Sequence, residues 1–191
     1  LSPDLAADAS DTQSSVSTTF EDVKPTDWFY QAVTYVQQNG IFGGTSEHSF
    51  SPNGTMTRAM YVTVLGRMAG VDVSQYTTSA FKDVKPSAYY APYVQWAVEK
   101  GITDGTGNHR FSPDTTITRE QMATLTLRYF EVDNIPYQTN ASVTTKPKDL
   151  SKISPWAVDA IVKLWQAGLL TGDNKGNFNP QSRAIRADAA V

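Results

Sequence analysis

The chain has 191 residues, which is long enough for one domain or two small ones with a hydrophobic core. Apolar residues make up 40% and charged residues 18%, as in globular proteins, and no apolar run approaches the roughly 20 residues of a membrane-spanning helix. The 16 basic and 19 acidic residues leave a net charge of −3, which argues against a protein that binds nucleic acid or a membrane surface. The sequence has no cysteine and two histidines, which excludes a disulfide framework and a thiolate or three-histidine metal site, so we expect no metal and no cofactor.

The two ends of the sequence differ from the rest. Residues 1–19 are rich in Ser, Thr, Asp and Ala and are interpreted as a linker or flexible tail, with a short helix over Pro3–Ala7 as an alternative. The sequence starts at Leu1 without a signal segment and stops at Val191 inside a predicted helix. We therefore expect it to be part of a longer, exported protein whose targeting peptide has been removed or lies outside this sequence.

Three copies of one unit make up most of the chain. Residues 20–62 align with residues 81–123 without a gap, and 17 of the 43 aligned positions are identical. A third copy aligns at its Gly, Pro, aromatic and Arg positions and carries one extra residue before Trp156. We assign the repeats to residues 20–75, 81–133 and 147–191, and we interpret the third as truncated.

Each repeat begins with a predicted helix whose apolar residues recur at helical spacing, as from Trp28 to Val36 in the first copy. Thr26 or Asp27 is the predicted N-cap in the first copy, and Ser154 is the predicted N-cap in the third. A glycine is expected to end each of these helices in a left-handed turn, at Gly40, Gly101 and Gly168.

A loop and a second helix complete each repeat. The loop has Gly and Asp near its start and a Phe-Ser/Asn-Pro segment at its end, and we expect its phenylalanine to plug the core, at Phe50, Phe111 and Phe178. The second helix is predicted to start at Thr57, Thr118 and Ile185. Thr118 and Gln121 form a capping-box pattern, whereas Ile185 offers no side-chain acceptor.

The repeats are expected to close on one another. A unit of about 45 residues cannot bury a sufficient core alone. We therefore predict a mainly all-α, pseudo-threefold domain within a monomeric chain, in which the first helices form a central bundle and the second helices project outward.

The order and spacing of these motifs resemble the S-layer homology (SLH) domain family. The pattern runs F-x-D-V-x(4)-W/Y, then Gly-Ile/Leu, then Phe-Ser/Asn-Pro, then Thr-Arg, and it covers residues 20–191. The family's signature at the second helix is Thr-Arg-Ala-Glu. All three copies keep the arginine and none keeps the full tetrad, because they read Thr57-Arg58-Ala59-Met60, Thr118-Arg119-Glu120-Gln121 and Ile185-Arg186-Ala187-Asp188.

The resemblance implies a module without catalytic activity that anchors a secreted protein non-covalently to the bacterial cell wall or S-layer. It implies a secondary cell-wall polysaccharide as the ligand, often bearing pyruvylated N-acetylmannosamine. It also implies a three-pronged spindle with ligand grooves between the prongs.

Three arginines are the central candidates for ligand binding: Arg58, Arg119 and Arg186. A pyruvyl ketal carries one carboxylate, and a planar guanidinium can bind a carboxylate through two parallel hydrogen bonds. Each arginine follows a helix start, where backbone amides and the helix dipole also favour an anion, so Thr57 and Thr118 are included in the predicted site. The structural alternative is an arginine that is solvated or paired with a neighbouring Asp.

The other candidates are aromatic rings that could stack on a pyranose, loop glycines that let backbone amides approach a sugar, and loop carboxylates that could accept bonds from hydroxyls. They are Trp28, Tyr89, Trp156, Gly43, Gly44, Gly105, Gly172, Asp104 and Asp173. The structural alternatives are burial for the rings and turn formation for the glycines. Recurring aspartates are expected to brace a neighbouring loop and two loop histidines to face solvent; these are Asp22, Asp83, Asp149, His48 and His109.

Binding is favoured over catalysis. No Gly-x-Ser-x-Gly elbow, phosphate loop or zinc motif occurs, and three similar surfaces suit a repetitive polymer better than a single active site does. The alternative function is a protein–protein assembly module of a surface layer. Because Arg186 follows the uncapped Ile185 in the truncated repeat, we expect Arg186 to be mobile and the third site to be weak.

Overall fold

The computed structural model describes residues 17–138 and 145–191. In these residues the fold is all-α, as predicted, and β-structure is limited to isolated bridges. The predicted linker over residues 1–19 lies almost entirely outside the described residues, and so does the alternative helix over Pro3–Ala7. The helices are α1 (Tyr30–Gln38), α2 (Arg58–Met68), α3 (Ala91–Glu99), α4 (Arg119–Val132), α5 (Val158–Gln166) and α6 (Arg186–Ala190), with short 3-10 helices η1 (Val73–Gln75) and η2 (Leu150–Lys152).

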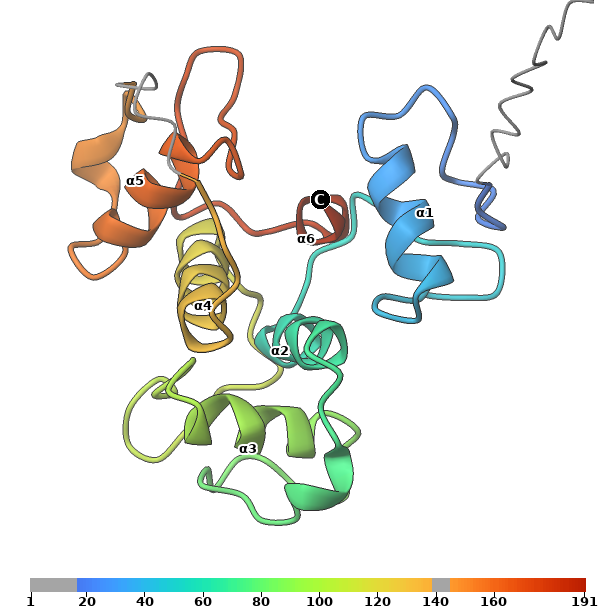
Figure 1. Ribbon diagram of the computed structural model, residues 1–191, viewed down its shortest axis with the longest axis vertical. Helices are drawn as coiled ribbons and strands as arrows, with labels where there is room; N and C mark the ends of the chain where they lie inside the picture. Colours follow the sequence, from blue (N-terminus) through green and yellow to red (C-terminus); the bar gives the residue numbers. More distant parts are fainter. Residues whose placement is uncertain (1–16, 139–144) are drawn as a thin grey trace, which may run out of the picture.

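Helices from neighbouring repeats pair to form three lobes (Figure 1). The second helix of one repeat packs on the first helix of the next, so that α2 packs on α3 and α4 packs on α5. The final helix, α6, returns to pack on α1. The first helices lie on the outside and the second helices start near the centre, where α2 also packs on α4. The prediction that the first helices form a central bundle is therefore wrong.

The segments that lead into the second helices explain this arrangement. Their apolar residues Met56, Ile117 and Ala184 have no exposed surface. Backbone hydrogen bonds join the three segments in a ring, from the Met56 amide to the Ala184 carbonyl (3.2 Å), from Ile117 to Met56 (2.9 Å) and from Ala184 to Ile117 (3.0 Å). Extended backbone can make such bonds, whereas backbone inside a helix is already paired. The ring links the repeats in cyclic order, and a pseudo-threefold symmetry about it stays a prediction.

The ends of the first helices agree only in part with the predictions. The predicted glycines end them with left-handed backbone, at Gly40 (φ 66°), Gly101 (φ 74°) and Gly168 (φ 73°). The predicted N-caps are wrong. α1 starts at Tyr30 without a side-chain cap, and the Asp27 carboxylate instead accepts a hydrogen bond from the Lys24 amide (2.7 Å). The Ser154 hydroxyl donates to Glu120 on α4 (2.9 Å), because the chain turns once more before α5.

The phenylalanine near the end of each loop is buried, as predicted, because Phe50 and Phe111 are 0% exposed and Phe178 is 1% exposed. The Asp22 carboxylate accepts hydrogen bonds from the amides of Phe50 (2.8 Å) and Ser51 (2.7 Å). Burial alone would raise the pKa of Asp22, but these hydrogen bonds outweigh it and lower the pKa. In the other two repeats, Asp83 and Asp149 accept hydrogen bonds from the amides of the equivalent phenylalanine and of the residue after it. The prediction that the three aspartates brace a loop is therefore confirmed.

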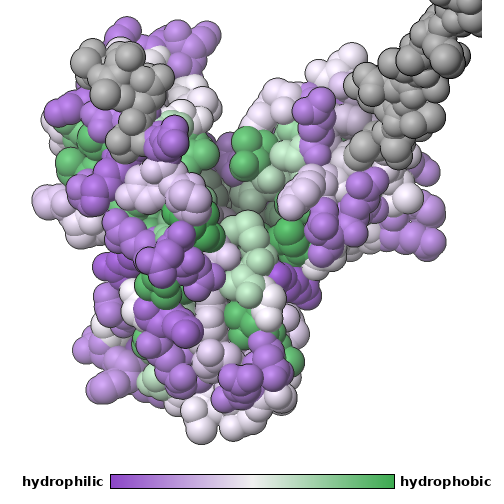
Figure 2. Space-filling model, viewed as in Figure 1, coloured by the Kyte–Doolittle hydropathy of each residue, from purple (hydrophilic) through white to green (hydrophobic). Residues whose placement is uncertain are grey.

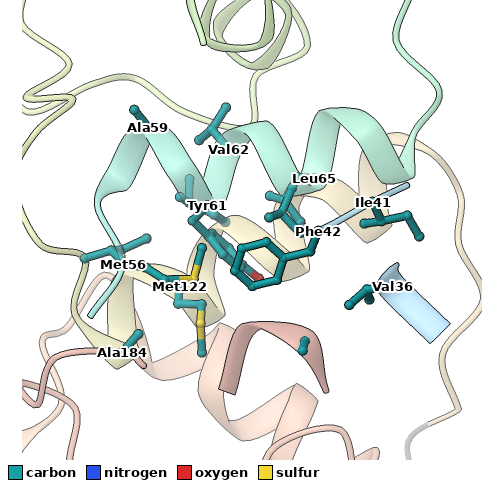
Figure 3. Packing of buried hydrophobic residues seen from close by; sticks show 14 of the residues in the cluster. Val36, Ile41, Phe42, Met56, Ala59, Tyr61, Val62, Leu65, Met122 and Ala184 are labelled. Carbon is teal, nitrogen blue, oxygen red and sulfur yellow. The ribbon is translucent and has the colours of Figure 1, made fainter. Parts of the chain in front are cut away.

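α2 contributes most to the larger of two hydrophobic clusters. Tyr61 and Leu65 on this helix pack with Phe42 from the first loop and Met122 from α4 (Figure 3). The hydroxyl groups of Tyr61 and Thr126 on α4 are hydrogen-bonded at 2.6 Å. The smaller cluster fills the lobe of α4 and α5. The core therefore combines contacts within a repeat, such as Phe42 with Phe50, and contacts between repeats, such as Tyr61 with Thr126.

Tyr61 gives the fold a defined sensitivity to high pH. Its side chain is 5% exposed, and burial raises the pKa of Tyr61 to about 12, against an opposing effect of the hydrogen bond with Thr126. The unfolded chain loses this proton near pH 10, so the free energy of unfolding falls as pH rises from about 10 to 12, by about 3 kcal/mol for this group. In urea unfolding at pH 8 and pH 11, Tyr61→Phe should lose less stability than the wild type.

The matched control is Tyr35→Phe, because Tyr35 is 61% exposed. This variant should lose as much stability between the two pH values as the wild type does. A remaining loss in Tyr61→Phe is expected from Tyr129, whose pKa burial also raises to about 12. Equal losses in Tyr61→Phe and Tyr35→Phe would contradict the prediction.

Candidate functional site

Three cavities lie where the lobes meet, and we name each after its arginine. The Arg58 groove, of about 430 Å³, is lined by Arg58, Thr103, Asp104, Gly105, Thr106, Gln121, Thr124, Leu125, Arg128 and Trp156. The Arg119 groove, of about 440 Å³, is lined by Trp28, Arg119, Thr171, Gly172, Asp173, Phe178, Asn179, Ser182 and Asp188. The Arg186 groove, of about 180 Å³, is lined by Phe42, Gly43, Gly44, Met60, Thr63, Val64, Arg67, Tyr89 and Arg186.

All three grooves are assembled in the same way. The arginine comes from one repeat, the loop and the second helix from the next, and the aromatic ring from the third. In the Arg58 groove, Arg58 belongs to the first repeat, Asp104 to the second and Trp156 to the third. Figure 2 shows the molecule hollowed between the α1 lobe and the α5 lobe, which supply Trp28 and Gly172 to the Arg119 groove. A groove therefore forms only when all three repeats are folded together.

The three arginines are anchored to the loop of the next repeat. In each case the Nε–H donates to the carbonyl of the buried phenylalanine, and the guanidinium lies over the same ring, between 4.7 and 4.8 Å from its centre. The hydrogen-bonded pairs are Arg58 with Phe111 (2.9 Å), Arg119 with Phe178 (3.0 Å) and Arg186 with Phe50 (2.7 Å). Each arginine therefore joins two repeats as well as lining a groove.

The remaining guanidinium nitrogens differ between the grooves. Arg119 donates from Nη1 to the Asp188 carboxylate (3.0 Å) and from Nη2 to the Thr171 carbonyl (3.1 Å). Arg186 donates from Nη2 to the Gly43 carbonyl (2.7 Å). Among the described residues, neither Nη group of Arg58 has a hydrogen-bond partner. Arg58 thus has the most donors left for a ligand.

The prediction that Arg186 is mobile is wrong. The residue is 5% exposed, and the carbonyls of Phe50 and Gly43 hold its guanidinium. Burial lowers the pKa of Arg186, although the Asp22 carboxylate acts in the opposite direction. The helix start also lacks a side-chain cap at Ile185, as predicted, but contacts with the first repeat replace it. A large loss of rotamer freedom on binding is therefore not a reason for a weak site in the third repeat.

The backbone amides at the second helix starts are not free for a ligand. The first two amides of α2 donate to the carbonyls of Thr115 (2.9 Å) and Pro113 (3.1 Å) in the next repeat, and α4 and α6 begin with the same pairing. The predicted contribution of these amides to anion binding is wrong. The predicted N-caps of the second helices, Thr57 and Thr118, are confirmed, because each threonine hydroxyl accepts a hydrogen bond from the amide three residues later. Neither threonine lines a groove.

The three aromatic rings at the groove rims are exposed, so the alternative of burial in the core is wrong. The exposed fractions are 65% for Trp28, 59% for Tyr89 and 55% for Trp156. Trp28 meets Phe29 edge-to-face at 5.3 Å, and Tyr89 meets Tyr90 in the same way at 5.2 Å. These contacts orient the two rings while their other surfaces stay open to the grooves.

The predicted loop residues have structural roles within the protein. At three of the loop glycines a Cβ atom would overlap a loop carbonyl and an aromatic ring, so a side chain cannot be accommodated: Gly44, Gly105 and Gly172. Asp104 is paired with Arg128 at 3.1 Å. The Asp173 carboxylate accepts bonds from the side chains of Asn179 (3.0 Å) and Asn177 (3.2 Å), which hold the pKa of Asp173 well below its usual range.

Sequence reasoning missed several residues that line the grooves. The most consequential are Arg67 and Arg128, which occupy equivalent positions nine residues after Arg58 and Arg119. The repeat alignment contained this signal, because it places one arginine over the other. The residues at the third position of each second helix were not predicted to line the grooves either, although one lies in each groove: Met60, Gln121 and Asp188.

Within residues 17–138 and 145–191, no cluster of three His, Asp or Glu side chains could hold a metal ion. In the same residues, no helix combines the length and the apolar character needed to cross a membrane. The residues that line the grooves include arginines, aromatic residues, residues with hydroxyl or carboxylate groups, and the neutral amides of Gln121 and Asn179.

The S-layer homology domain model matches residues 19–59, 80–123 and 148–190, one segment in each repeat. The chain belongs to the S-layer homology domain family. The three matched segments agree with the three repeats found in the sequence. Each segment ends inside a second helix, after the groove arginine with which that helix starts.

Three relatives illustrate where this domain occurs. An endoglucanase of Bacillus sp. (strain KSM-635) is 34% identical over 90% of this chain and 18% of its own length. An S-layer protein of Bacillus thuringiensis subsp. finitimus is 26% identical over 90% of this chain and 20% of its own length. A cellulosome-anchoring protein of Acetivibrio thermocellus is 29% identical over 78% of this chain and 36% of its own length.

The chain thus spans well under half of each of these relatives. The part they share with it is the SLH region, which occurs beside very different partner regions. An SLH region common to S-layer and anchoring proteins is a cell-surface anchoring module, and it places this chain at the cell surface or cell wall.

Proposed function

We propose that this SLH module binds an anionic secondary cell-wall polysaccharide, in which pyruvylated N-acetylmannosamine supplies the carboxylate. One observation carries the proposal: each of the three grooves places a guanidinium beside an exposed aromatic ring and a glycine-containing loop. A guanidinium suits a carboxylate, and an exposed ring suits the apolar face of a sugar. The two groups together match a sugar that carries a ketal-linked acid.

The proposed division of roles follows the groove geometry. In the Arg58 groove, the Nη groups of Arg58 would bind the carboxylate and Trp156 would stack on the pyranose. Thr103, Thr106 and Thr124 line the same cavity, and the exposed Thr106 would accept hydrogen bonds from sugar hydroxyls. Because Arg58 is buried and held by the Phe111 carbonyl, little side-chain freedom would be lost on binding.

Several grooves on one chain suit a repetitive polymer. Modest affinity at each groove multiplies when neighbouring units of one polymer occupy two grooves. Each groove is lined by residues from all three repeats of one chain, and we propose that the module acts as a monomer. Its place of action would be the wall of a bacterium, after secretion, holding whatever partner region the longer protein carries.

Removal of the pyruvate groups should abolish most of the binding. If carboxylate capture drives affinity, purified wall polymer should lose at least about tenfold in affinity when mild acid removes its pyruvate, because each charge-assisted hydrogen bond contributes about 1.5–3 kcal/mol. Binding to the intact polymer should also weaken as salt rises from low to high concentration. Calorimetry with peptidoglycan-free polymer, intact and depyruvylated, measures both effects.

Equal affinity for the two polymer forms would rule out carboxylate capture and leave recognition of neutral sugars by the aromatic rings. A chain that binds neither form but associates with itself or with another surface protein would instead support the assembly alternative.

A further inference from the structure

A buried carboxylate that takes no part in the proposed function lies at the start of α4. Glu120, the second residue of this helix, is 3% exposed and lines none of the three grooves. Among the described residues, no Lys, Arg or His side chain lies within ion-pair distance of it. Burial of a carboxylate is costly unless hydrogen bonds satisfy its oxygens, so the partners of Glu120 indicate what it holds in place.

Both oxygens of Glu120 accept hydrogen bonds from the third repeat. Oε2 accepts from the Ser154 amide (3.0 Å), and Oε1 accepts from the Ser154 hydroxyl (2.9 Å). Oε1 also accepts from the side-chain amide of Gln181 (2.6 Å). Two of the three bonds go to Ser154, so the backbone and the side chain of this residue are attached to α4 together.

The segment that is attached in this way carries the aromatic ring of the Arg58 groove. Ser154 lies two residues before Trp156, which lines that groove. Pro155 stands between them, and its fixed φ limits how the backbone can move there. On the other side, Ala157 is 0% exposed and donates its amide to the Ser154 carbonyl (2.8 Å). Trp156 is therefore part of a short turn whose first residue is bonded to the buried carboxylate of α4.

The aromatic rings of the other two grooves are held by a different contact. Trp28 meets the ring of Phe29 edge-to-face, and Tyr89 meets the ring of Tyr90 in the same way. An alanine follows Trp156 instead of an aromatic residue, so the third ring has no such neighbour. The third ring therefore needs another contact to hold its position.

The residue equivalent to Glu120 also differs in the other two lobes. Ala59 is the second residue of α2, and Ala187 is the second residue of α6. Neither side chain can accept a hydrogen bond, so neither can hold the turn that precedes the ring of its lobe. The two differences coincide, because the ring without an aromatic neighbour is the one whose turn is bonded to a carboxylate.

We propose that Glu120 is a positioning residue for the Arg58 groove. By holding Ser154, it fixes the turn that presents Trp156 to the ligand. The carboxylate does not touch the ligand, but it removes freedom that the ring would otherwise lose on binding. This inference rests on the proposed function and extends it to a residue outside the groove.

Three substitutions separate the contacts of this carboxylate. Glu120→Ala removes all three hydrogen bonds and gives α4 the side chain that the other two second helices have at this position. Ser154→Ala removes the bond of the hydroxyl and keeps that of the amide. Gln181→Ala removes the remaining partner and leaves Ser154 attached, so it is the matched control.

Two NMR measurements on the full chain report on the turn and on the groove. The heteronuclear ¹⁵N NOE of the Trp156 indole, recorded without ligand, reports motion of the ring on the picosecond-to-nanosecond timescale. Titration with the methyl glycoside of pyruvylated N-acetylmannosamine then reports the affinity of two grooves. The Trp156 signal follows the Arg58 groove, and the Tyr89 ring signals follow the Arg186 groove.

Glu120→Ala should lower the NOE of the Trp156 indole and weaken binding in the Arg58 groove by about three- to tenfold, because the turn must then be ordered on binding. Ser154→Ala should be intermediate in both measurements, and Gln181→Ala should match the wild type. The affinity reported by Tyr89 should be the same in all four proteins. A general loss of stability would not change Trp156 and spare Tyr89.

The outcomes separate the positioning role from the proposed function. The role of Glu120 is overturned if Glu120→Ala leaves either the NOE or the affinity at Trp156 unchanged, or if Gln181→Ala has an equal effect. If Glu120→Ala does not fold, the same comparison is made between Ser154→Ala and Gln181→Ala. If the glycoside shifts neither ring signal in the wild type, the proposed function fails, whereas the NOE still decides whether Glu120 holds the turn.

Discussion

Residues 20–75, excised from the rest of the chain, should form a largely unfolded peptide. In the complete chain, α1 packs on α6 and α2 packs on α3, and both partners lie outside this segment. The Met56 amide also loses its carbonyl partner on Ala184, and Arg58 loses Phe111. The remaining apolar residues of one repeat cannot offset the conformational entropy of about 50 ordered residues. Far-ultraviolet circular dichroism and a thermal melt should show little helix and no cooperative transition.

A fragment of equal length provides the control. Residues 57–112 contain α2, α3 and the contact between Arg58 and Phe111, so they hold one complete lobe instead of one complete repeat. This fragment should be more helical than 20–75 under the same conditions. A cooperative melt of the 20–75 fragment would show that the repeat folds alone and would contradict the arrangement of lobes.

The elements of each repeat could be predicted from the sequence because local chemistry determines them. A glycine with a positive φ ends each first helix, and Thr57 and Thr118 cap the second helices through their own side chains. Buried phenylalanines and the aspartates that brace them recur at fixed spacing, so their alignment in three copies revealed a shared local role. These features require only residues that are close in sequence or equivalent between repeats.

The partners of each helix could not be predicted in the same way. An apolar helix face shows that a helix is covered, but it does not show whether its own repeat or the next one covers it. The answer depends on the segments around Met56, Ile117 and Ala184, which pair with one another through backbone groups. Backbone pairing leaves only a weak trace in side-chain identity, so the central ring was missed.

The candidate site could likewise be predicted in its local features but not in its contacts between repeats. The structure brings the predicted arginines, aromatic rings, glycines and loop aspartates into three cavities, and it leaves Thr57 and Thr118 outside them. Their role in ligand binding stays a prediction. The combination of Arg58 with Trp156, almost 100 residues later, depends on the exchange of partners between repeats and could not be predicted. The pairing of Asp188 with Arg119 depends on it as well.

Arg58→Ala should weaken both the fold and the groove. The Nε–H of Arg58 donates to the Phe111 carbonyl at 2.9 Å, and the guanidinium lies 4.8 Å from the centre of the Phe111 ring. Removing a hydrogen bond of a charged group costs about 1.5–3 kcal/mol, and the contact with the ring adds about 1 kcal/mol. Release of a buried charge offsets part of this cost, since burial lowers the pKa of Arg58. We expect a net loss of about 3 kcal/mol, or roughly 6–12 °C in Tm.

The stability control is Arg67→Ala, because Arg67 lies on the same helix and is exposed. Its stability should stay within about 0.5 kcal/mol of the wild type. Binding must then be measured well below the lowered Tm, where Arg58→Ala should bind intact wall polymer about tenfold more weakly and respond less to salt than the wild type. Arg58→Lys, which keeps the charge but loses the planar fork, should be intermediate in both measurements. An Arg58→Ala chain as stable as Arg67→Ala would mean that Arg58 does not join the first two repeats, and any loss of polymer binding would then report on the groove alone.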